Sequence, residues 1–355
     1  MNILRHRAWL AALAALCVAS VAAAQAEKPD VVILATGGTI AGAAATGTQS
    51  GYTSGAVTID TMVAAVPGIG ELATIKGEQI ANVGSQDMSF EVLLNVARRI
   101  NELSADARVD GFVITHGTDT MEESAYFLNL VIKTRKPVVM VGSMRPSTAV
   151  SADGPLNLYN GVAVAANPDA QGRGVLVVMN DQIHAAHSLT KMSTTEVETF
   201  MSPFRGLIGM VSYGKADFYN RPAWKHTLDS EFDVARVSRM PRVDIVLASI
   251  DMSPDIIDAA VTQGARGIVI AGVGNGNMNK AAVEAAARAV KRGVVVVRSS
   301  RVPTGSVGRN VEIDDDKLGF VASDELNPQK ARILLALALL KPRSTADIQQ
   351  LYYTY

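Results

Sequence analysis

Two short segments of the chain combine threonine with glycine directly after an apolar run. The first is Thr36–Thr39 (TGGT), which follows VVILA, and the second is HGTDT at residues 116–120, which follows GFVIT. Glycine allows a ligand to approach the backbone, whose N–H groups can then stabilise an oxyanion. A threonine hydroxyl in such a turn can act as a nucleophile when a base lies near, and Asp119 could pair with a substrate ammonium. Either turn alone would more simply end a strand, but the two together favour a catalytic site.

A glycine-rich loop follows the first of these turns. Residues 41–58 (AGAAATGTQSGYTSGAVT) are small, mostly apolar or hydroxylated, and uncharged. A loop of this length inside a compact domain is usually functional or mobile. We therefore expect it to act as a lid over the site.

The elements that position the two turns follow an alternating pattern. Buried parallel strands are predicted at 30–38, 111–117, 136–143 and 174–180, because these are continuous apolar runs that end in glycine or a small polar residue. Helices are predicted between them at 90–103, 121–132 and 153–166, and residues 243–300 repeat the order strand, helix, strand, helix, strand. The last helix is predicted to begin with Asn327 as N-cap and Pro328 at its first position. This alternation predicts an α/β fold in which ligands bind beyond the carboxyl ends of the strands.

The domain organisation follows from one interruption of this pattern. Residues 220–241 mix proline and charge with few periodic apolar positions, which is typical of a linker. We therefore predict two domains, each with a mainly parallel sheet flanked by helices. The larger, N-terminal and catalytic domain spans 27–219, and the smaller C-terminal domain spans 242–355.

The first 26 residues have the layout of a secretory signal peptide. Arg5 and Arg7 precede an alanine-rich apolar run, and small residues near Ala26 offer a cleavage site. A permanent membrane anchor is the alternative, but the run is short for one. Cleavage would remove Cys17, the only cysteine, so the mature chain would have no disulfide and no cysteine nucleophile. We expect export and no membrane association afterwards.

Composition narrows the class of protein. Hydrophobic residues make up 48% of the 355 residues and charged residues 19%, which suits a full core and excludes a disordered chain. The formal net charge is −1, so no general basic field would attract nucleic acid. We expect no nucleic-acid partner.

Several other motifs are incomplete. Gly209–Lys215 begins like a phosphate-binding loop, but alanine stands where the Mg²⁺-binding hydroxyl belongs, and Gly272–Gly276 lacks the third glycine of a dinucleotide turn. His184 and His187 could seat a metal from one helix, but no carboxylate lies near them in sequence, and two polar loop residues are the simpler interpretation. The serine motif of α/β-hydrolases is absent from the sequence. We expect neither a metal nor a cofactor.

The two threonine motifs carry a family resemblance. TGGTIAG and HGTDTMEESAYFL resemble segments of the bacterial type II (periplasmic) L-asparaginases and their glutaminase-asparaginase relatives. The resemblance extends in order through KGEQIANVGSQDM, RPSTAVSADGPLNLYN, GVLVVMND, AGVGNGN, VVRSSRVPTG, GFVAS and LNPQKARILLALAL, from about Asp30 to Tyr355. It implies hydrolysis of L-asparagine to L-aspartate and ammonia through a covalent acyl-threonine, without metal or cofactor. It also implies a periplasmic homotetramer built as a dimer of intimate dimers.

The resemblance also implies catalytic residues. By position in the family motifs, Thr39 is the nucleophile and Tyr52 in the lid is its hydroxyl partner. Thr118, Asp119 and Lys191 would form a second catalytic set. Such a set is chemically coherent, because a partly desolvated lysine tied to a carboxylate can accept or relay a hydroxyl proton.

Substrate-binding residues are implied in the same way. Ser85, Gln86 and Asp119 resemble the groups that bind the α-carboxylate and α-ammonium of the substrate. Asn277 and Glu312 resemble residues that a neighbouring subunit contributes. Without the resemblance, Glu312 would be one member of an exposed acidic run.

Two functional alternatives stay open at this stage. The family segment Gly-Ala-Met-Arg-Pro contains Ser143 in place of alanine here, so the preference between asparagine and glutamine is open, and a glutaminase-asparaginase of relaxed specificity is the close alternative. One methylene discriminates by only about 1–3 kcal/mol. An exported amino-acid-binding protein is the alternative from another class.

Overall fold

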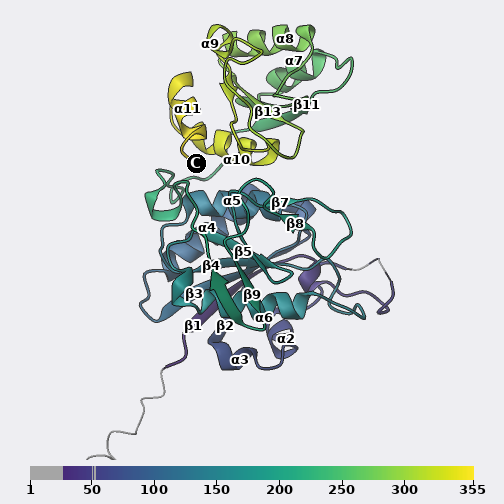
Figure 1. The fold of residues 1–355 in the computed structure, drawn as a ribbon, viewed down its shortest axis with the longest axis vertical. Helices are drawn as coiled ribbons and strands as arrows, with labels where there is room; N and C mark the ends of the chain where they lie inside the picture. Colours follow the sequence, from purple (N-terminus) through teal and green to yellow (C-terminus); the bar gives the residue numbers. More distant parts are fainter. Residues whose placement is uncertain (1–26, 50, 52) are drawn as a thin grey trace, which may run out of the picture.

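The structure is a computed structural model that describes residues 27–49, 51 and 53–355. The predicted signal peptide and Tyr52 lie outside the described residues. Figure 1 shows a large domain that contains the N-terminal part of the chain and, above it, a smaller domain that contains the C-terminal part. Each domain has its own sheet, so the prediction of a two-domain α/β fold is confirmed.

The large domain is built on an eight-stranded sheet in the order β10-β9-β6-β5-β4-β3-β1-β2. The five strands from β5 to β2 are parallel: β1 (Asp30–Gly37), β2 (Thr74–Val83), β3 (Val109–Thr115), β4 (Val138–Val141) and β5 (Val175–Met179). They include the four strands predicted from apolar runs. The other three extend the sheet in antiparallel fashion and were not predicted: β6 (Gln182–Ala185), β9 (Gly209–Ser212) and β10 (Lys215–Phe218).

Helices cover both faces of this sheet. On one face lie α4 (Phe90–Leu103) and α5 (Met121–Val131), and on the other α2 (Ile59–Ala64), α3 (Ile69–Leu72) and α6 (Gly154–Ala165). The helix predicted at 90–103 has those bounds in the structure, because Ser89 caps its first turn by accepting a hydrogen bond from the Val92 N–H at 3.3 Å.

The small domain has a four-stranded parallel sheet. Its strands are β11 (Val243–Leu247), β12 (Gly267–Gly272), β13 (Val295–Ser300) and β14 (Val321–Ala322). On one face lie α7 (Asp255–Thr262) and α8 (Lys280–Lys291), and α9 (Asp315–Leu318) precedes β14. On the other face, α10 (Pro328–Ala338) and α11 (Thr345–Tyr352) complete the domain.

Helix α10 also joins the two domains. It packs against α5 of the large domain, and their apolar side chains belong to one continuous core. The prediction for its start is confirmed, since Asn327 is the N-cap and Pro328 the first helical residue. The segment 220–241 is irregular apart from the 3-10 turn Thr227–Asp229, and its apolar residues Phe232, Val234 and Met240 enter the same core.

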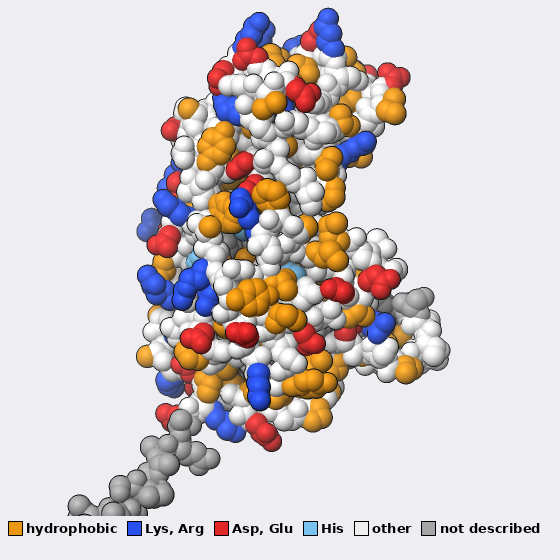
Figure 2. Space-filling view, viewed as in Figure 1, with side chains coloured by type: hydrophobic (Ala, Val, Ile, Leu, Met, Phe, Trp, Pro, Cys, Tyr) orange, Lys and Arg blue, Asp and Glu red, His pale blue; other side chains and the backbone are white. Residues whose placement is uncertain are grey.

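The surface agrees with the near-neutral composition. In the view of Figure 2, acidic and basic side chains are interspersed, and the surface is hollowed between the two domains. A cleft of about 360 Å³ lies between the domains, lined by Lys191 and Met192 of the large domain and by Ile245, Leu247 and Arg301 of the small one. Within the described part of the chain, no helix is both long and apolar enough to cross a membrane.

Candidate active site

The two threonine turns meet at one edge of the large sheet. They follow β1 and β3, which are parallel neighbours, so both turns leave the sheet on the same side. The Thr36 hydroxyl donates to the Thr115 carbonyl oxygen at 2.8 Å. Gly38 has a φ of +85°, and a Cβ there would lie 2.3 Å from the Gly117 nitrogen, so only glycine permits this contact. Thr39 follows directly, is 7% exposed and begins a short 3-10 helix.

A lysine that is distant in sequence reaches the second turn. Lys191 Nζ donates to Thr118 Oγ1 at 2.9 Å and to Asp119 Oδ1 at 2.8 Å. The Thr118 residue is buried, whereas the lysine and aspartate side chains are 19% and 59% exposed. The structure therefore brings Thr118, Asp119 and Lys191 together as a hydroxyl, a carboxylate and a cation. The hydroxyl is held beside a group that can exchange a proton with it.

A third turn adds Ser85 to this edge. It follows β2, the parallel neighbour of β1 on the other side. Ser85 Oγ accepts a hydrogen bond from the Asp119 N–H at 3.1 Å, and the Ser85 carbonyl oxygen accepts one from Thr120 Oγ1 at 2.7 Å. Gln86 is exposed next to it and donates to Asp87 Oδ2 at 3.2 Å. Ser85 therefore lies within the threonine cluster, and Gln86 borders it.

Glu122 supports the lysine, and the sequence analysis missed it. Lys191 belongs to β7 (Thr190–Lys191), which pairs with β8 (Phe200–Met201) in a separate two-stranded sheet. Glu122, in the first turn of α5, accepts the Lys191 backbone N–H at 3.0 Å, and its other oxygen accepts Asn327 Nδ2 at 3.3 Å. It is only 5% exposed. An acidic residue on the buried face of a predicted helix was the available signal.

A second lysine supports the same segment from α10. Lys330 is 3% exposed and donates to the His187 carbonyl oxygen at 2.7 Å and to the Leu189 carbonyl oxygen. Burial lowers the pKa of Lys330 to about 8, and the charge of Glu122 partly offsets this. The segment that carries Lys191 is therefore held from both domains.

The histidine of the HGTDT motif is buried and uncharged at neutral pH. Burial lowers the pKa of His116 to about 4, although its Nδ1 lies 2.6 Å from the Gly117 carbonyl oxygen. A protonated imidazole at neutral pH is therefore not among the groups of this site.

His184 and His187 are both buried; the interpretation as polar loop residues is wrong for His184, whereas His187 does lie in the turn after β6. His184 lies on β6, and His187 stacks on Trp224 with 3.8 Å between ring centroids. Burial lowers the pKa of His184 to about 4 and that of His187 to about 3. Among residues 27–49, 51 and 53–355, no three or more histidine, cysteine or acidic side chains are arranged to hold a metal ion.

Asn277 and Glu312 lie together in the small domain. Asn277 follows β12, and its Nδ2 donates to Glu312 Oε2 at 2.5 Å. The Glu312 side chain is exposed. In the described part of the chain, neither residue has a hydrogen bond or ion pair with Thr118 or Lys191. The structure therefore joins these two residues to each other, with no direct hydrogen bond to the threonine cluster of the same chain.

The expected lid is anchored at both ends. Ala43 and Thr53 exchange backbone hydrogen bonds of 3.1 and 2.9 Å, and Val57 N–H donates to the Ala41 carbonyl oxygen at 2.9 Å. The Asn82 side chain donates to the Gly55 carbonyl oxygen at 2.9 Å. The loop therefore leaves and returns close to Thr39, but Tyr52 lies outside the described residues.

Ser143, which replaces the alanine of the family segment, faces its own turn. It is fully buried, and its hydroxyl donates to the Arg145 carbonyl oxygen at 2.7 Å. The hydroxyl therefore has a partner within its own segment.

Comparison with known proteins identifies the class of protein that this fold and site define. Residues 30–224 match the family model for the N-terminal domain of asparaginase, and residues 242–352 match that for the C-terminal domain of glutaminase/asparaginase. The chain belongs to the asparaginase family and is an amide hydrolase, so the alternative of an amino-acid-binding protein is wrong.

Individual relatives match over almost the whole chain. The chain is 52% identical to a probable periplasmic L-asparaginase of Haemophilus influenzae, over 92% of this chain and 93% of that protein. It is 47% identical to a glutaminase-asparaginase of Pseudomonas fluorescens, over 92% of this chain and 90% of that protein. A probable cytoplasmic L-asparaginase of Campylobacter jejuni has a similar solved structure, with a TM-score of 0.89 and 47% identity over 92% of this chain and 100% of that one.

Proposed function

We propose that the protein hydrolyses L-asparagine to L-aspartate and ammonia through a covalent acyl-threonine at Thr39. The observation that carries this proposal is the pair of bonds from Lys191 to Thr118 and Asp119, at the sheet edge where the Thr39 turn also lies. The sequence similarity to proteins named L-asparaginase agrees with it.

Acylation begins with the attack of Thr39 Oγ on the side-chain amide carbon of the substrate. The Thr39 hydroxyl proton passes to the hydroxyl groups around it and to Lys191, with Tyr52 of the lid as the partner of Thr39. Collapse of the tetrahedral intermediate breaks the C–N bond, and the leaving nitrogen takes up a proton and departs as ammonia. Backbone N–H groups of the glycine-rich turns stabilise the oxyanion.

Deacylation uses the second set of groups. Thr118 and Lys191 activate a water molecule, which attacks the ester carbon and releases the aspartate side-chain carboxylate and the Thr39 hydroxyl. The Asp119 carboxylate compensates the lysine charge through the 2.8 Å bond and also faces the substrate ammonium. Thr118 and Asp119 therefore act as one unit with Lys191, without metal or cofactor.

Substrate binding involves two chains. Ser85, Gln86 and Asp119 bind the α-carboxylate and α-ammonium, and a neighbouring subunit adds Asn277 and Glu312. Within the described residues, the pair bonds to itself and has no direct bond to the threonine cluster of its own chain, which agrees with this arrangement. A two-fold axis makes the exchange reciprocal, so each intimate dimer holds two complete sites, and two such dimers form a homotetramer.

We also propose that the enzyme works in the periplasm. Residues 1–26 would be the signal peptide, residues 27–219 the catalytic domain, 220–241 the linker and 242–355 the C-terminal domain. One relative at 52% identity is named periplasmic, which supports this location, although the solved structure at 47% identity is named cytoplasmic. After cleavage the protein would have no membrane association.

A glutaminase-asparaginase of relaxed specificity is the second candidate. The relative from Pseudomonas fluorescens at 47% identity carries that name. Comparison of kcat/KM for L-asparagine and L-glutamine with the purified protein decides between the two. A ratio above about 100 would establish an asparaginase, because one methylene alone rarely discriminates by more.

The nucleophile is tested by its adduct. Mass spectrometry after reaction with a slow substrate or reactive analogue should find the acyl group on Thr39, and Thr39→Ala should lose nearly all turnover while it still binds L-aspartate. Activity should survive exhaustive chelation. An adduct on Thr118 or Ser85 would refute the assignment.

A further inference from the structure

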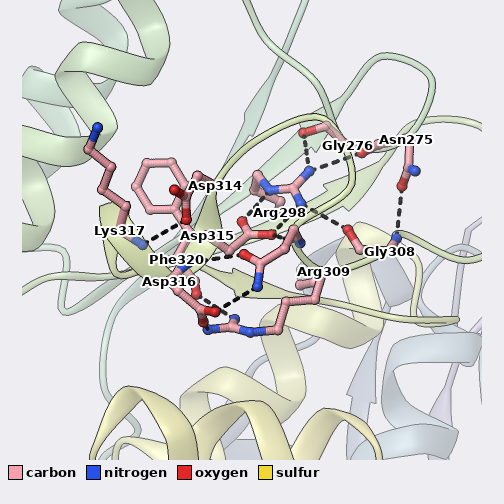
Figure 3. A network of polar contacts seen from close by, with 12 residues as sticks. Asn275, Gly276, Arg298, Gly308, Arg309, Asp314, Asp315, Asp316, Lys317 and Phe320 are labelled. Carbon is pink, nitrogen blue, oxygen red and sulfur yellow. Dashed lines mark hydrogen bonds and ion pairs between the residues drawn. The ribbon is translucent and has the colours of Figure 1, made fainter.

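An arginine in the small domain is buried together with its carboxylate partner. Arg298 on β13 is 1% exposed, and its partner Asp315 is 0% exposed. The guanidinium donates from Nε to Asp315 Oδ1 at 2.6 Å and from Nη2 to Asp315 Oδ2 at 2.7 Å (Figure 3). Removing two charges from water is costly, so a buried ion pair contributes little net stability compared with an apolar pair. Its presence calls for a role other than stability.

The remaining donors of Arg298 bind backbone carbonyl groups. Nη1 donates to the carbonyl oxygens of Asn275 at 3.0 Å and Gly276 at 3.3 Å, and Nη2 donates to that of Gly308 at 3.0 Å. Figure 3 shows these carbonyl groups converging on the guanidinium from different segments of the chain. All five N–H donors of the guanidinium are thereby used, a geometry that lysine cannot reproduce.

The carbonyl groups belong to the two loops that carry Asn277 and Glu312. The first loop follows β12 and reaches Asn277 immediately after Gly276, and the second runs from Gly308 past Glu312 to Asp315. A Cβ on Gly276 would lie 3.1 Å from Arg298 Nη1 and 2.8 Å from Val307 Cγ1, so this loop is pressed against the guanidinium.

Further bonds tie the two loops to each other. The Gly308 N–H donates to Asn275 Oδ1 at 2.8 Å, and the Asn310 N–H donates to Asp315 Oδ2 at 2.8 Å. At the exposed end of the same assembly, Asn277 Nδ2 bonds Glu312 Oε2 at 2.5 Å. The buried ion pair is therefore linked through the backbone to the half-buried Asn277 and the exposed Glu312.

We propose that Arg298, held by Asp315, is a positioning residue that fixes the Asn277–Glu312 pair for a substrate bound at the threonine cluster of a neighbouring subunit. The inference rests on the proposed function, in which this pair acts across the subunit interface. A pair that is ordered before the substrate arrives binds more tightly, because no loop has to be ordered on binding. Arg298 touches neither substrate nor reacting atoms, and its effect passes through the two loops.

Steady-state kinetics test the positioning role. Arg298→Met should raise KM for L-asparagine about tenfold or more and change kcat less than about threefold, because the loops orient substrate and take no part in bond breaking. Arg298→Lys should give an intermediate KM. Ser299→Ala is the matched control: Ser299 is the next residue on β13, is equally buried and donates to the Leu326 carbonyl oxygen at 2.8 Å, away from both loops. It should leave KM unchanged.

A milder variant keeps the proposal testable if Arg298→Met does not fold. Asn275→Ala removes the side-chain bond to the Gly308 N–H and leaves the ion pair intact. It should raise KM in the same direction by about threefold. If Arg298→Met and Asn275→Ala lower stability but leave KM at the wild-type value, Arg298 has a structural role only and the proposal is wrong.

Mixed oligomers test whether Arg298 affects the site of its own subunit or that of the neighbouring subunit. Arg298→Met and Thr118→Val subunits are unfolded and refolded together, and activity is measured well below the wild-type KM. Half of the randomly formed dimers are mixed, and each has one site with an intact Thr118 and an intact partner arginine. About a quarter of wild-type activity should return. Glu312→Ala mixed with Thr118→Val is run in parallel as the reference.

The two mixtures separate failure of this inference from failure of the proposed function. If only the Glu312→Ala mixture recovers, the interface arrangement stands and the role of Arg298 is refuted. If neither recovers in samples shown to contain mixed dimers, the interface arrangement itself is wrong, and the inference fails with it. Recovery in both supports the proposal.

Discussion

The two domains hold their functional side chains in different ways. In the large domain, Lys191 bonds directly to Thr118 and Asp119, and its segment is held by Glu122 and by Lys330 of α10. These groups come from distant parts of one chain and meet at one place.

In the small domain, the two side chains assigned to substrate binding have no hydrogen bond to Thr118 or Lys191 within the described residues. The half-buried Asn277 and the exposed Glu312 bond to each other, on loops that a buried arginine ties together. In the proposed arrangement, a group for the chain's own site is positioned by direct contact, whereas a group offered to a neighbouring subunit is ordered in advance. The following predictions test this contrast, from the largest expected effect to the smallest.

Acid should destabilise the large domain first. His116, His184 and His187 all lie there, and burial lowers the pKa of His116 and His184 to about 4 and that of His187 to about 3. Residues 242–355 contain no histidine. Their ordinary pKa is 6.5, so between pH 6.5 and 4 the unfolded state binds more protons than the folded state. The stabilisation is fully present above about pH 6.5 and falls with pH by about 1.4 kcal/mol per pH unit for each histidine.

Hydrogen exchange measured by mass spectrometry at pH 7 and pH 5 checks this prediction. Peptides of the large-domain core should lose protection at pH 5, while β12 and β13 keep theirs. Fluorescence of Trp224, which stacks on His187, should report the same transition. Equal loss of protection in both domains would contradict the histidine assignment.

Lys191→Met should remove most of the turnover. The change deletes the group that bonds Thr118 and Asp119, and loss of a proton-transfer group lowers kcat by about 10²- to 10⁴-fold. Combining it with Thr118→Val should cost little more, because the two groups act as one unit. Stopped-time ammonia assays give kcat, and calorimetry with L-aspartate should still detect binding. A kcat within tenfold of wild type would show that Lys191 is not part of the catalytic set.

Glu122→Leu should have a smaller effect on the same step. It removes the acceptor of the Lys191 N–H, so the lysine shifts relative to Thr118, and kcat should fall about 10-fold to 100-fold. Glu123→Leu is the matched control, because the adjacent Glu123 lies 3.7 Å from Arg332 and has no bond to Lys191. The two variants are compared by kcat and by thermal unfolding. Equal kcat values would refute the supporting role of Glu122.

Ser143→Ala should have the smallest effect. The hydroxyl bonds the Arg145 carbonyl oxygen in its own turn, so its loss should lower the free energy of unfolding by about 1 kcal/mol. The ratio of kcat/KM for asparagine and glutamine should stay within about twofold of wild type, because the hydroxyl already has its partner within its own turn. A larger change in that ratio would assign Ser143 to specificity.

Local patterns allowed much of the fold to be predicted. The apolar runs that became β1, β3, β4 and β5 are buried on both faces, so continuous hydrophobicity is a sufficient signal. The caps at Ser89 and Asn327 act within one helical turn, and the start of α10 could therefore be predicted from the sequence. Strands β6, β9 and β10 were missed because they are short and form through antiparallel pairing, which no local run of apolar residues indicates.

The sequence by itself determined the α/β alternation, the two threonine turns at strand ends and, through its motifs, the family. The family motifs implied that Thr118, Asp119 and Lys191 act together, but only the tertiary structure decided the contacts: Lys191 donates to both side chains, which are 73 and 72 residues away along the chain. It also decided that Glu122, Lys330 and Arg298 are buried rather than solvated: Glu122 accepts from N–H groups, whereas Lys330 and Arg298 donate to backbone carbonyl groups and, for Arg298, to a carboxylate. The physical reason is the distance along the chain over which each kind of interaction acts. Periodicity and capping depend on neighbours within a few residues, whereas the partner of a buried charge is supplied by whichever distant segment the packing of the sheets brings to it.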